Sequence, residues 1–239
     1  MKRFFKEVSA VPAAGGGFDV CLDGKPMRTP AGTPLRLPHA ALAEAVAAEW
    51  RAQGEQVLPH TMPVTQLAST ALDRVPHQRP AILAHVLSYA DTDLLCYRAA
   101  GPEDLAARQT ALWQPVLDWL SARLGVDLAV TEGILPITQS EAALAALSAH
   151  VSGYDDFTLA AFQAAVAALG SLFLAVALAE RRLTAEEVVV ASLLDETYQI
   201  EFWGEDPETM LRRTNLRNDI IAAGRFMDIC FHMCPPMHS

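Results

Sequence analysis

FDVCLDGKPMRTPAG, residues 18–32, decides the fold of the N-terminal part of this chain. Over residues 18–22, Phe, Val and Leu alternate with Asp and Cys, a period of two that is typical of a half-buried strand. Asp23-Gly24 follows, and this pair favours a tight hairpin turn. We therefore predict a small antiparallel sheet, with further strands at residues 27–29 and 35–37.

A helix is expected directly after this sheet. The segment 39–53 repeats an apolar residue at every fourth position, ending with Trp50, and Gly54 then stops the pattern. An amphipathic helix of this kind packs across one face of a sheet. Beyond residue 62, helical patterns dominate. We therefore predict an α+β fold, in which residues 1–62 form a small antiparallel β-sheet domain with a packed helix, and residues 63–239 form a mostly α-helical domain.

Residues 157–179 form an apolar run that needs an explanation. No charged side chain occurs across these 23 positions, which is long enough for a membrane span. Nine of the residues are alanine, which contributes little to insertion, and Gly170-Ser171 interrupts the run. We therefore predict two buried helices in a soluble protein, with Gly170 in a structural role at the turn between them.

The composition argues against some partners. Lys and Arg total 18 against 28 Asp and Glu, and the formal charge of −10 repels a nucleic-acid backbone. Cys21, Cys96, Cys230 and Cys234 have no secretory signal before them, which is typical of a reduced intracellular protein. We expect a cytoplasmic bacterial protein, a monomer, that binds neither nucleic acid nor membrane.

The segment after Thr184 contains the acids that we consider the best candidates for a functional site. Thr184 and Glu187 form a capping box, which predicts one helix that continues to Gly204. Asp195 and Glu196 interrupt the apolar positions of this helix. A carboxylate among apolar neighbours has either a raised pKa or a cationic partner, and both patterns are common at functional sites.

Two interpretations of this acid pair stay open. In the first, the acids and nearby aromatic side chains form a surface that binds a partner, and the aromatic residues are Tyr198, Phe202 and Trp203. In the second, the acids form structural ion pairs with one of the later arginines, Arg212, Arg213 or Arg217.

An enzyme is the alternative class of function. A metal- or nucleotide-dependent hydrolase or transferase could use Asp195 with Glu196, or Asp91 with Asp93. Helix capping is the structural interpretation of the second pair. Because the sequence has no common nucleophile, zinc or phosphate-loop signature, we predict that the protein is not an enzyme and needs no cofactor.

The C-terminal segment carries side chains that bind soft metals. Residues 225–239 contain several Met, Cys and His, including Cys230, His232 and Cys234, which suit copper(I) or zinc. No second cluster of ligands accompanies them, and free Cys and Met also fill protein cores. We therefore expect no metal site.

Seven strings of the sequence occur, in the same order, in one known family. They are RFFKEV (3–8), GFDVCLDGKPMRTPAG (17–32), AAEWRAQGE (47–55), PVTQLASTALD (63–73), YADTDLLCYRA (89–99), LGSLFLAVALA (169–179) and LLDETYQIEFWGED (193–206). On these strings, which span nearly the whole chain, the protein resembles the ATP synthase alpha-subunit assembly chaperones.

This resemblance implies a function. A member of the family would bind the unassembled alpha subunit of the F1 sector and prevent its aggregation until beta subunit replaces the chaperone, without catalysis. The functionally sensitive acid of the family corresponds to Asp195, with Glu196 as the alternative. The tryptophan of the family's helix-end motif is Trp50, which we expect to pack between helix and sheet.

Overall fold

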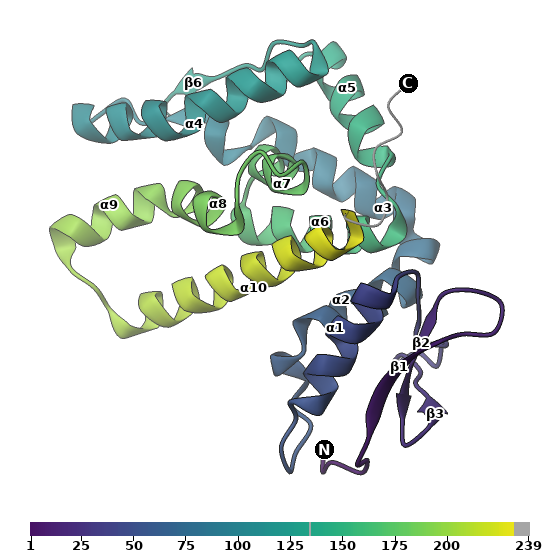
Figure 1. Cartoon of the computed structure of the whole chain (residues 1–239). Helices are drawn as coiled ribbons and strands as arrows, with labels where there is room; N and C mark the ends of the chain where they lie inside the picture. Colours follow the sequence, from purple (N-terminus) through teal and green to yellow (C-terminus); the bar gives the residue numbers. More distant parts are fainter. Residues whose placement is uncertain (134, 232–239) are drawn as a thin grey trace. The chain divides into compact units, whose positions relative to one another are not determined.

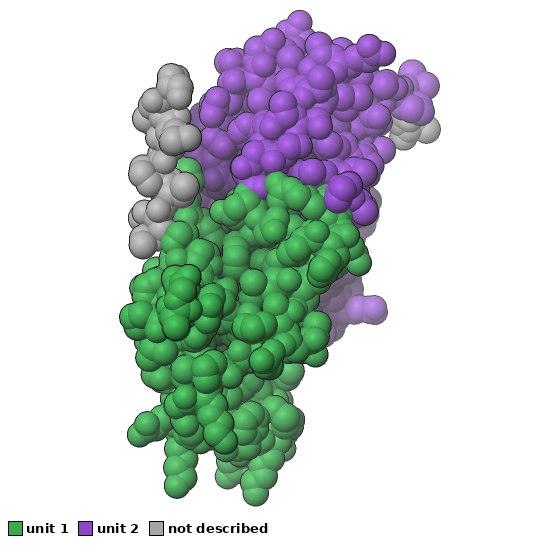
Figure 2. Space-filling model, turned by 90° about the vertical axis from the view of Figure 1, so that its right-hand side faces the viewer, with its two compact units in different colours: residues 1–79, 155–161, 225–239 green, residues 80–154, 162–224 purple. Residues whose placement is uncertain are grey.

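The computed structural model describes residues 1–133 and 135–231 (Figure 1). It contains two compact units (Figure 2). Unit 1 comprises residues 1–79, 155–161 and the described residues from 225 onward, and unit 2 comprises residues 80–154 and 162–224 without Ile134. Unit 1 extends past Met62, where the sequence predicted the domain boundary. The position of that boundary stays a prediction. His232 and Cys234, the tail ligands considered above, lie outside the described residues.

Unit 1 contains a four-stranded antiparallel sheet. Its strands are β1 (Val8–Pro12), β2 (Phe18–Leu22), β3 (Lys25–Pro26) and β4 (Arg36–Leu37). β2 is the central strand, because it pairs with β1 on one side and with both β3 and β4 on the other. The predicted turn at Asp23-Gly24 is confirmed, since both residues have the positive φ angles, 48° and 77°, that a tight hairpin requires.

Two details of the predicted sheet were wrong. The strand expected at residues 27–29 lies instead at residues 25–26, as β3, because the tight turn brings the chain back at once. Beyond it, only an isolated bridge joins Arg28 to Pro34. The prediction also missed β1. Its residues are all exposed or half-buried, so the strand shows no clear alternation of apolar side chains.

Helix α1 (Ala40–Arg51) packs against β1 and β2, as predicted. Trp50, near its end, lies 5.5 Å from the ring of Phe5 and borders the small core of Phe5, Val57 and Met62. A 3-10 turn, η1 (Pro59–Thr61), leads into α2 (Pro63–Asp73).

The remaining chain is mostly helical, as the α+β prediction requires. Its helices are α3 (Val75–Leu87), η2 (Ser88–Asp91), η3 (Leu94–Cys96), α4 (Glu103–Leu124), α5 (Glu141–Ser152), α6 (Asp156–Leu169), α7 (Leu172–Ala179), α8 (Ala185–Ser192), α9 (Leu194–Trp203) and α10 (Pro207–Phe231). Two short strands that were not predicted, β5 (Tyr97–Arg98) and β6 (Thr131–Glu132), pair in parallel.

The apolar run folds as the predicted pair of helices. Gly170 separates α6 from α7 with a φ of +62°, and the Ser171 hydroxyl caps α7 by accepting a hydrogen bond from the N–H of Leu174. Every residue of α7 is buried, and α7 packs against α4 and α8 (Figure 1). In the described part of the chain, no helix combines the length and the apolar character that crossing a membrane requires.

The helix predicted from Thr184 to Gly204 is broken in two. The capping box of Thr184 and Glu187 is confirmed, but Leu193 is not helical and separates α8 from α9. Side chains on the two helices therefore do not follow one continuous set of stripes. Gly204 ends α9 as expected.

Candidate functional site

Helix α9 carries all five residues that the sequence suggested for partner binding (Figure 1). Asp195 and Glu196 lie in its first turn, where the helix dipole favours negative charge. Phe202 and Trp203 lie at its last turn. The helix thus presents acids at one end and aromatic side chains at the other.

Asp195 is held by a buried glutamine. Its Oδ1 accepts a hydrogen bond of 2.8 Å from Nε2 of Gln109, a residue of α4 that is only 1% exposed. Gln109 is itself fixed, because its Oε1 accepts from the N–H of Ala99 and its backbone carbonyl accepts from Arg98. Within the described residues, the second oxygen of Asp195 has no hydrogen bond. This half-buried carboxylate is therefore rigidly oriented and still has one free acceptor.

Glu196 forms the ion pair that was the alternative interpretation. Its Oε2 lies 2.7 Å from Nη2 of Arg212 and 3.6 Å from Nη1 of Arg213. Arg213 also donates to the hydroxyl of Thr197. The third candidate, Arg217, pairs instead with Glu186. Glu196 therefore joins α9 to α10 through its Oε2, whereas Asp195 has no cationic partner within the described residues.

Tyr198 is buried, with only 8% of its surface exposed. Its hydroxyl donates to Oδ1 of Asp104 at 2.8 Å, and desolvation together with this carboxylate raises its pKa. Arg108 lies 5.2 Å from the centre of the Tyr198 ring and donates to both oxygens of Glu201. Tyr198 thus helps to attach α9 to α4 and offers little surface to a partner.

Phe202 and Trp203, which we call the aromatic tip, are exposed. Phe202 is 63% exposed and Trp203 is 82% exposed. The ring of Phe202 packs against that of Tyr198 at 4.8 Å, which supports the tip from within. Leu211, in the first turns of α10, is also 62% exposed. Large apolar side chains that are this exposed are typical of a surface that binds another protein.

The acids Asp91 and Asp93 point to different partners. Asp93 is completely buried, and it accepts hydrogen bonds from the Ser171 hydroxyl at 2.7 Å and from the N–H of Phe173 at 3.0 Å. Its burial raises its pKa to about 6. Asp91 accepts from the N–H of Gln139. The capping interpretation is thus confirmed for Asp93, which caps both η3 and α7.

The sequence did not predict some residues of the site. Gln109, Asp104 and Arg108 of α4 fix the orientation of α9. Asp104 and Arg108 are one helical turn apart, which was the only local signal. Over the described residues, no three His, Cys, Asp or Glu side chains cluster closely enough to hold a metal ion.

Comparison with known proteins agrees with this architecture. The family model for the ATP12 chaperone protein matches residues 2–121. The Atu1473 protein of Agrobacterium tumefaciens has 42% identity and a TM-score of 0.92, with 96% of this chain and 86% of that chain covered.

Two solved structures of Atp12 from Paracoccus denitrificans, one of them an aspartate-to-lysine mutant, are also similar. Each has 37% identity and a TM-score of 0.90, covering 95% of this chain and 97% of that chain. The resemblance found in the seven strings is therefore confirmed, and the chain belongs to the ATP12 chaperone family.

Proposed function

We propose that this protein binds the unassembled alpha subunit of ATP synthase and prevents its aggregation until beta subunit replaces it. Membership of the ATP12 chaperone family and the likeness to Atp12 support this function. A subunit made to sit in a ring has apolar interfaces that aggregate when unpaired. The chaperone acts without catalysis or a cofactor, as a monomer in the bacterial cytoplasm.

The observation that carries the proposal is the exposed aromatic tip on the same helix as the free Asp195 oxygen. Aromatic side chains contribute a large share of the binding energy at protein interfaces. Phe202 and Trp203 would pack against an apolar patch of the client, and Asp195 would accept a hydrogen bond from a client N–H or a cationic side chain. Glu196 and Tyr198 would hold α9 in place for this contact.

The test is the refolding of denatured alpha subunit in the presence of the purified protein. Light scattering should fall as the protein approaches one equivalent, and scattering by refolding beta subunit should not change. Equal protection of both subunits would reduce the protein to a general holdase and contradict the proposal. Later addition of beta subunit should release the bound alpha subunit on a sizing column.

The aromatic tip is tested by the double variant Phe202→Ala/Trp203→Ala. Since both side chains are exposed, the variant should fold normally and lose at least tenfold in affinity for alpha subunit. Leu135→Ala is the matched control, because Leu135 is 70% exposed but lies outside α9. If both variants bind alpha subunit as the natural protein does, the tip is not the contact surface.

A further inference from the structure

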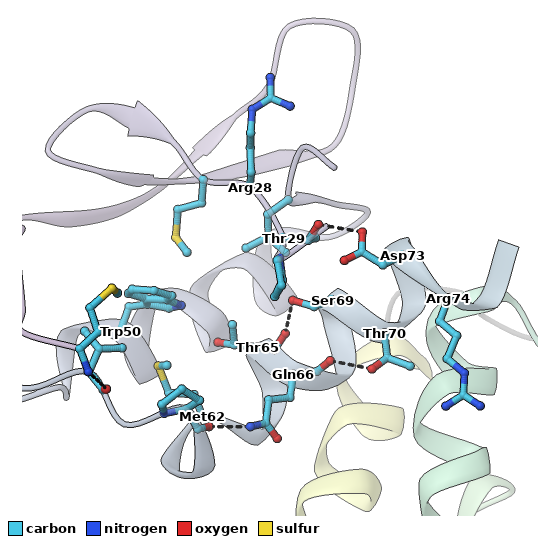
Figure 3. Close-up of a pocket in the computed structure, with 16 residues that line it drawn as sticks. Arg28, Thr29, Trp50, Met62, Thr65, Gln66, Ser69, Thr70, Asp73 and Arg74 are labelled. Atoms are coloured by element: carbon cyan, nitrogen blue, oxygen red, sulfur yellow. Dashed lines mark hydrogen bonds between the residues drawn. The ribbon is translucent and has the colours of Figure 1, made fainter. Parts of the chain in front are cut away.

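Unit 1 contains a groove that the proposed contact on α9 does not use. Its volume is about 670 Å³, within the range of sites that bind ligands. Figure 3 shows it between the segment after β3, which carries Arg28 and Thr29, and α2, with Trp50 at one end and Asp73 at the other. A second hollow of about 390 Å³ continues from it, sharing Met27, Arg28 and Trp50.

One wall of this α2 groove is apolar. It is formed by Met27, Leu35, Trp50, Val57 and Met62. Two of these side chains are methionines, which are flexible and adapt to the shape of different apolar partners. The wall thus suits a bulky aliphatic or aromatic side chain.

The opposite wall is a polar row on α2. It consists of Gln66, Ser69, Thr70 and Asp73. The hydroxyls of Ser69 and Thr70 donate to carbonyls of their own helix, so that each oxygen keeps a lone pair. Gln66 donates to the carbonyl of Pro59, and within the described residues its own side-chain oxygen has no hydrogen bond. The row therefore offers acceptors for N–H groups.

The groove also contains a donor without an acceptor. Nε1 of Trp50 is buried, and no group of the described residues accepts its hydrogen bond. A buried N–H is normally paired, so an acceptor on the ligand that reaches this N–H would be bound favourably. The groove thus offers acceptors for N–H groups on one wall and a donor for a carbonyl group at one end. This combination matches the backbone of an extended peptide, which carries both kinds of group.

The charges at the rim indicate the character of that peptide. Lys25, Arg28 and Arg74 border the two hollows, and none of them has an ion pair within the described residues. The acids Asp23 and Asp73 already accept hydrogen bonds from backbone N–H groups. In a chain with a net charge of −10, this rim is locally positive and complements an acid on the ligand.

We propose that the α2 groove binds an extended segment of the client protein, with one bulky apolar side chain against the methionine wall and acidic residues beside it. This contact is separate from the aromatic tip. It adds an anchor on unit 1 that would remain if the tip proved unimportant.

The experiment uses the full chain and overlapping twelve-residue peptides that cover the alpha subunit. Peptides with an apolar residue flanked by Asp or Glu should bind, and the Trp50 indole signal in a proton–nitrogen NMR spectrum should move to lower field as Nε1–H gains an acceptor. Trp50→Phe identifies that signal and should weaken binding about tenfold. Trp119→Phe, on α4, is the matched control and should leave binding unchanged.

A second variant tests the groove in case Trp50→Phe disturbs the fold. Ser69→Tyr fills the groove from its half-buried rim and should abolish peptide binding, with an unchanged circular dichroism spectrum. Binding of these peptides by Phe202→Ala/Trp203→Ala should persist, which separates this proposal from the function of the tip. The proposal is overturned if no peptide binds, if bound peptides leave the Trp50 signal in place, or if decanoate binds there and the peptides do not.

Discussion

Unit 2 contains two helix corners that differ in construction. The first, residues 169–172, joins α6 to α7, and the second, residues 192–194, joins α8 to α9. At the first, Gly170 has a positive φ, Ser171 caps the next helix and the buried Asp93 accepts from both the cap and the helix. At the second, the single residue Leu193 interrupts the helix and no side chain caps α9.

The two corners place their acids differently: one acid serves only the fold, and the other is available to a binding partner. Asp93 has no exposed surface, and its hydrogen bonds all serve the fold, two at the first corner and one at the start of η3. Asp195, just after the second corner, is half-buried, is held through one oxygen by Gln109 and keeps the other oxygen free. A weakly capped corner close to the surface can thus present an acid that a fully buried corner cannot.

The largest expected effect is the removal of Asp93. Asp93→Ala leaves the Ser171 hydroxyl and the N–H groups of Leu95 and Phe173 without their carboxylate acceptor in a dry interior. The free energy of unfolding should fall by about 3–4 kcal/mol. Urea denaturation followed by circular dichroism measures this. A loss as small as that of Asp118→Ala, at an exposed position of α4, would show that Asp93 does not hold the corner.

The pH dependence of the same variant sharpens the comparison. Burial raises the pKa of Asp93 to about 6, so between about pH 4 and 6 the folded protein keeps a proton that the unfolded chain releases. The free energy of unfolding of the natural protein, relative to Asp93→Ala, should therefore fall by roughly 2–3 kcal/mol as the pH rises through this window. A difference that stays constant over this range would contradict the raised pKa.

The sequence predicted the first corner but missed the second, for a physical reason. Gly170-Ser171 is an explicit local signal, because glycine adopts a positive φ and serine caps helices. Leu193 carries no such signal, since leucine favours helix. The helices on either side of it have different neighbours, because α8 packs against α7 and α9 packs against α4. The prediction of one continuous helix was therefore wrong, although its capping box at Thr184 and its end at Gly204 were confirmed.

The candidate site was predictable only in part for the same kind of reason. The exposure of Phe202 and Trp203 follows from their position before Gly204, where the helix ends. The division of roles between Asp195 and Glu196 depends on Gln109 and Arg212. Gln109 is 86 residues from Asp195, and no local pattern reports such a partner.

Gly170→Ala tests the backbone of the first corner alone. A β-carbon at this position would meet no atom within 4 Å, so the cost comes only from the φ of +62°. We expect a loss of about 1 kcal/mol in the free energy of unfolding. Gly54→Ala is the matched control, because its β-carbon also meets no atom and its φ is not positive. Equal effects of the two substitutions would remove the conformational argument for Gly170.

Asp195→Asn should have the smallest effect on stability and the clearest effect on function. An asparagine can still accept from Gln109 with its side-chain oxygen, so the free energy of unfolding should change by no more than about 0.5 kcal/mol. The free acceptor oxygen is replaced by an uncharged NH2 donor, so protection of alpha subunit should weaken. Asp195→Lys should weaken it further by reversing the charge. Glu196→Gln separates the two neighbours, because it breaks a partly exposed ion pair worth about 0.5 kcal/mol. Arg213 and Asp104 still hold α9 through Thr197 and Tyr198, so protection should weaken less than in Asp195→Asn. If Glu196→Gln abolished protection and Asp195→Asn did not, the roles assigned to the two acids would have to be exchanged.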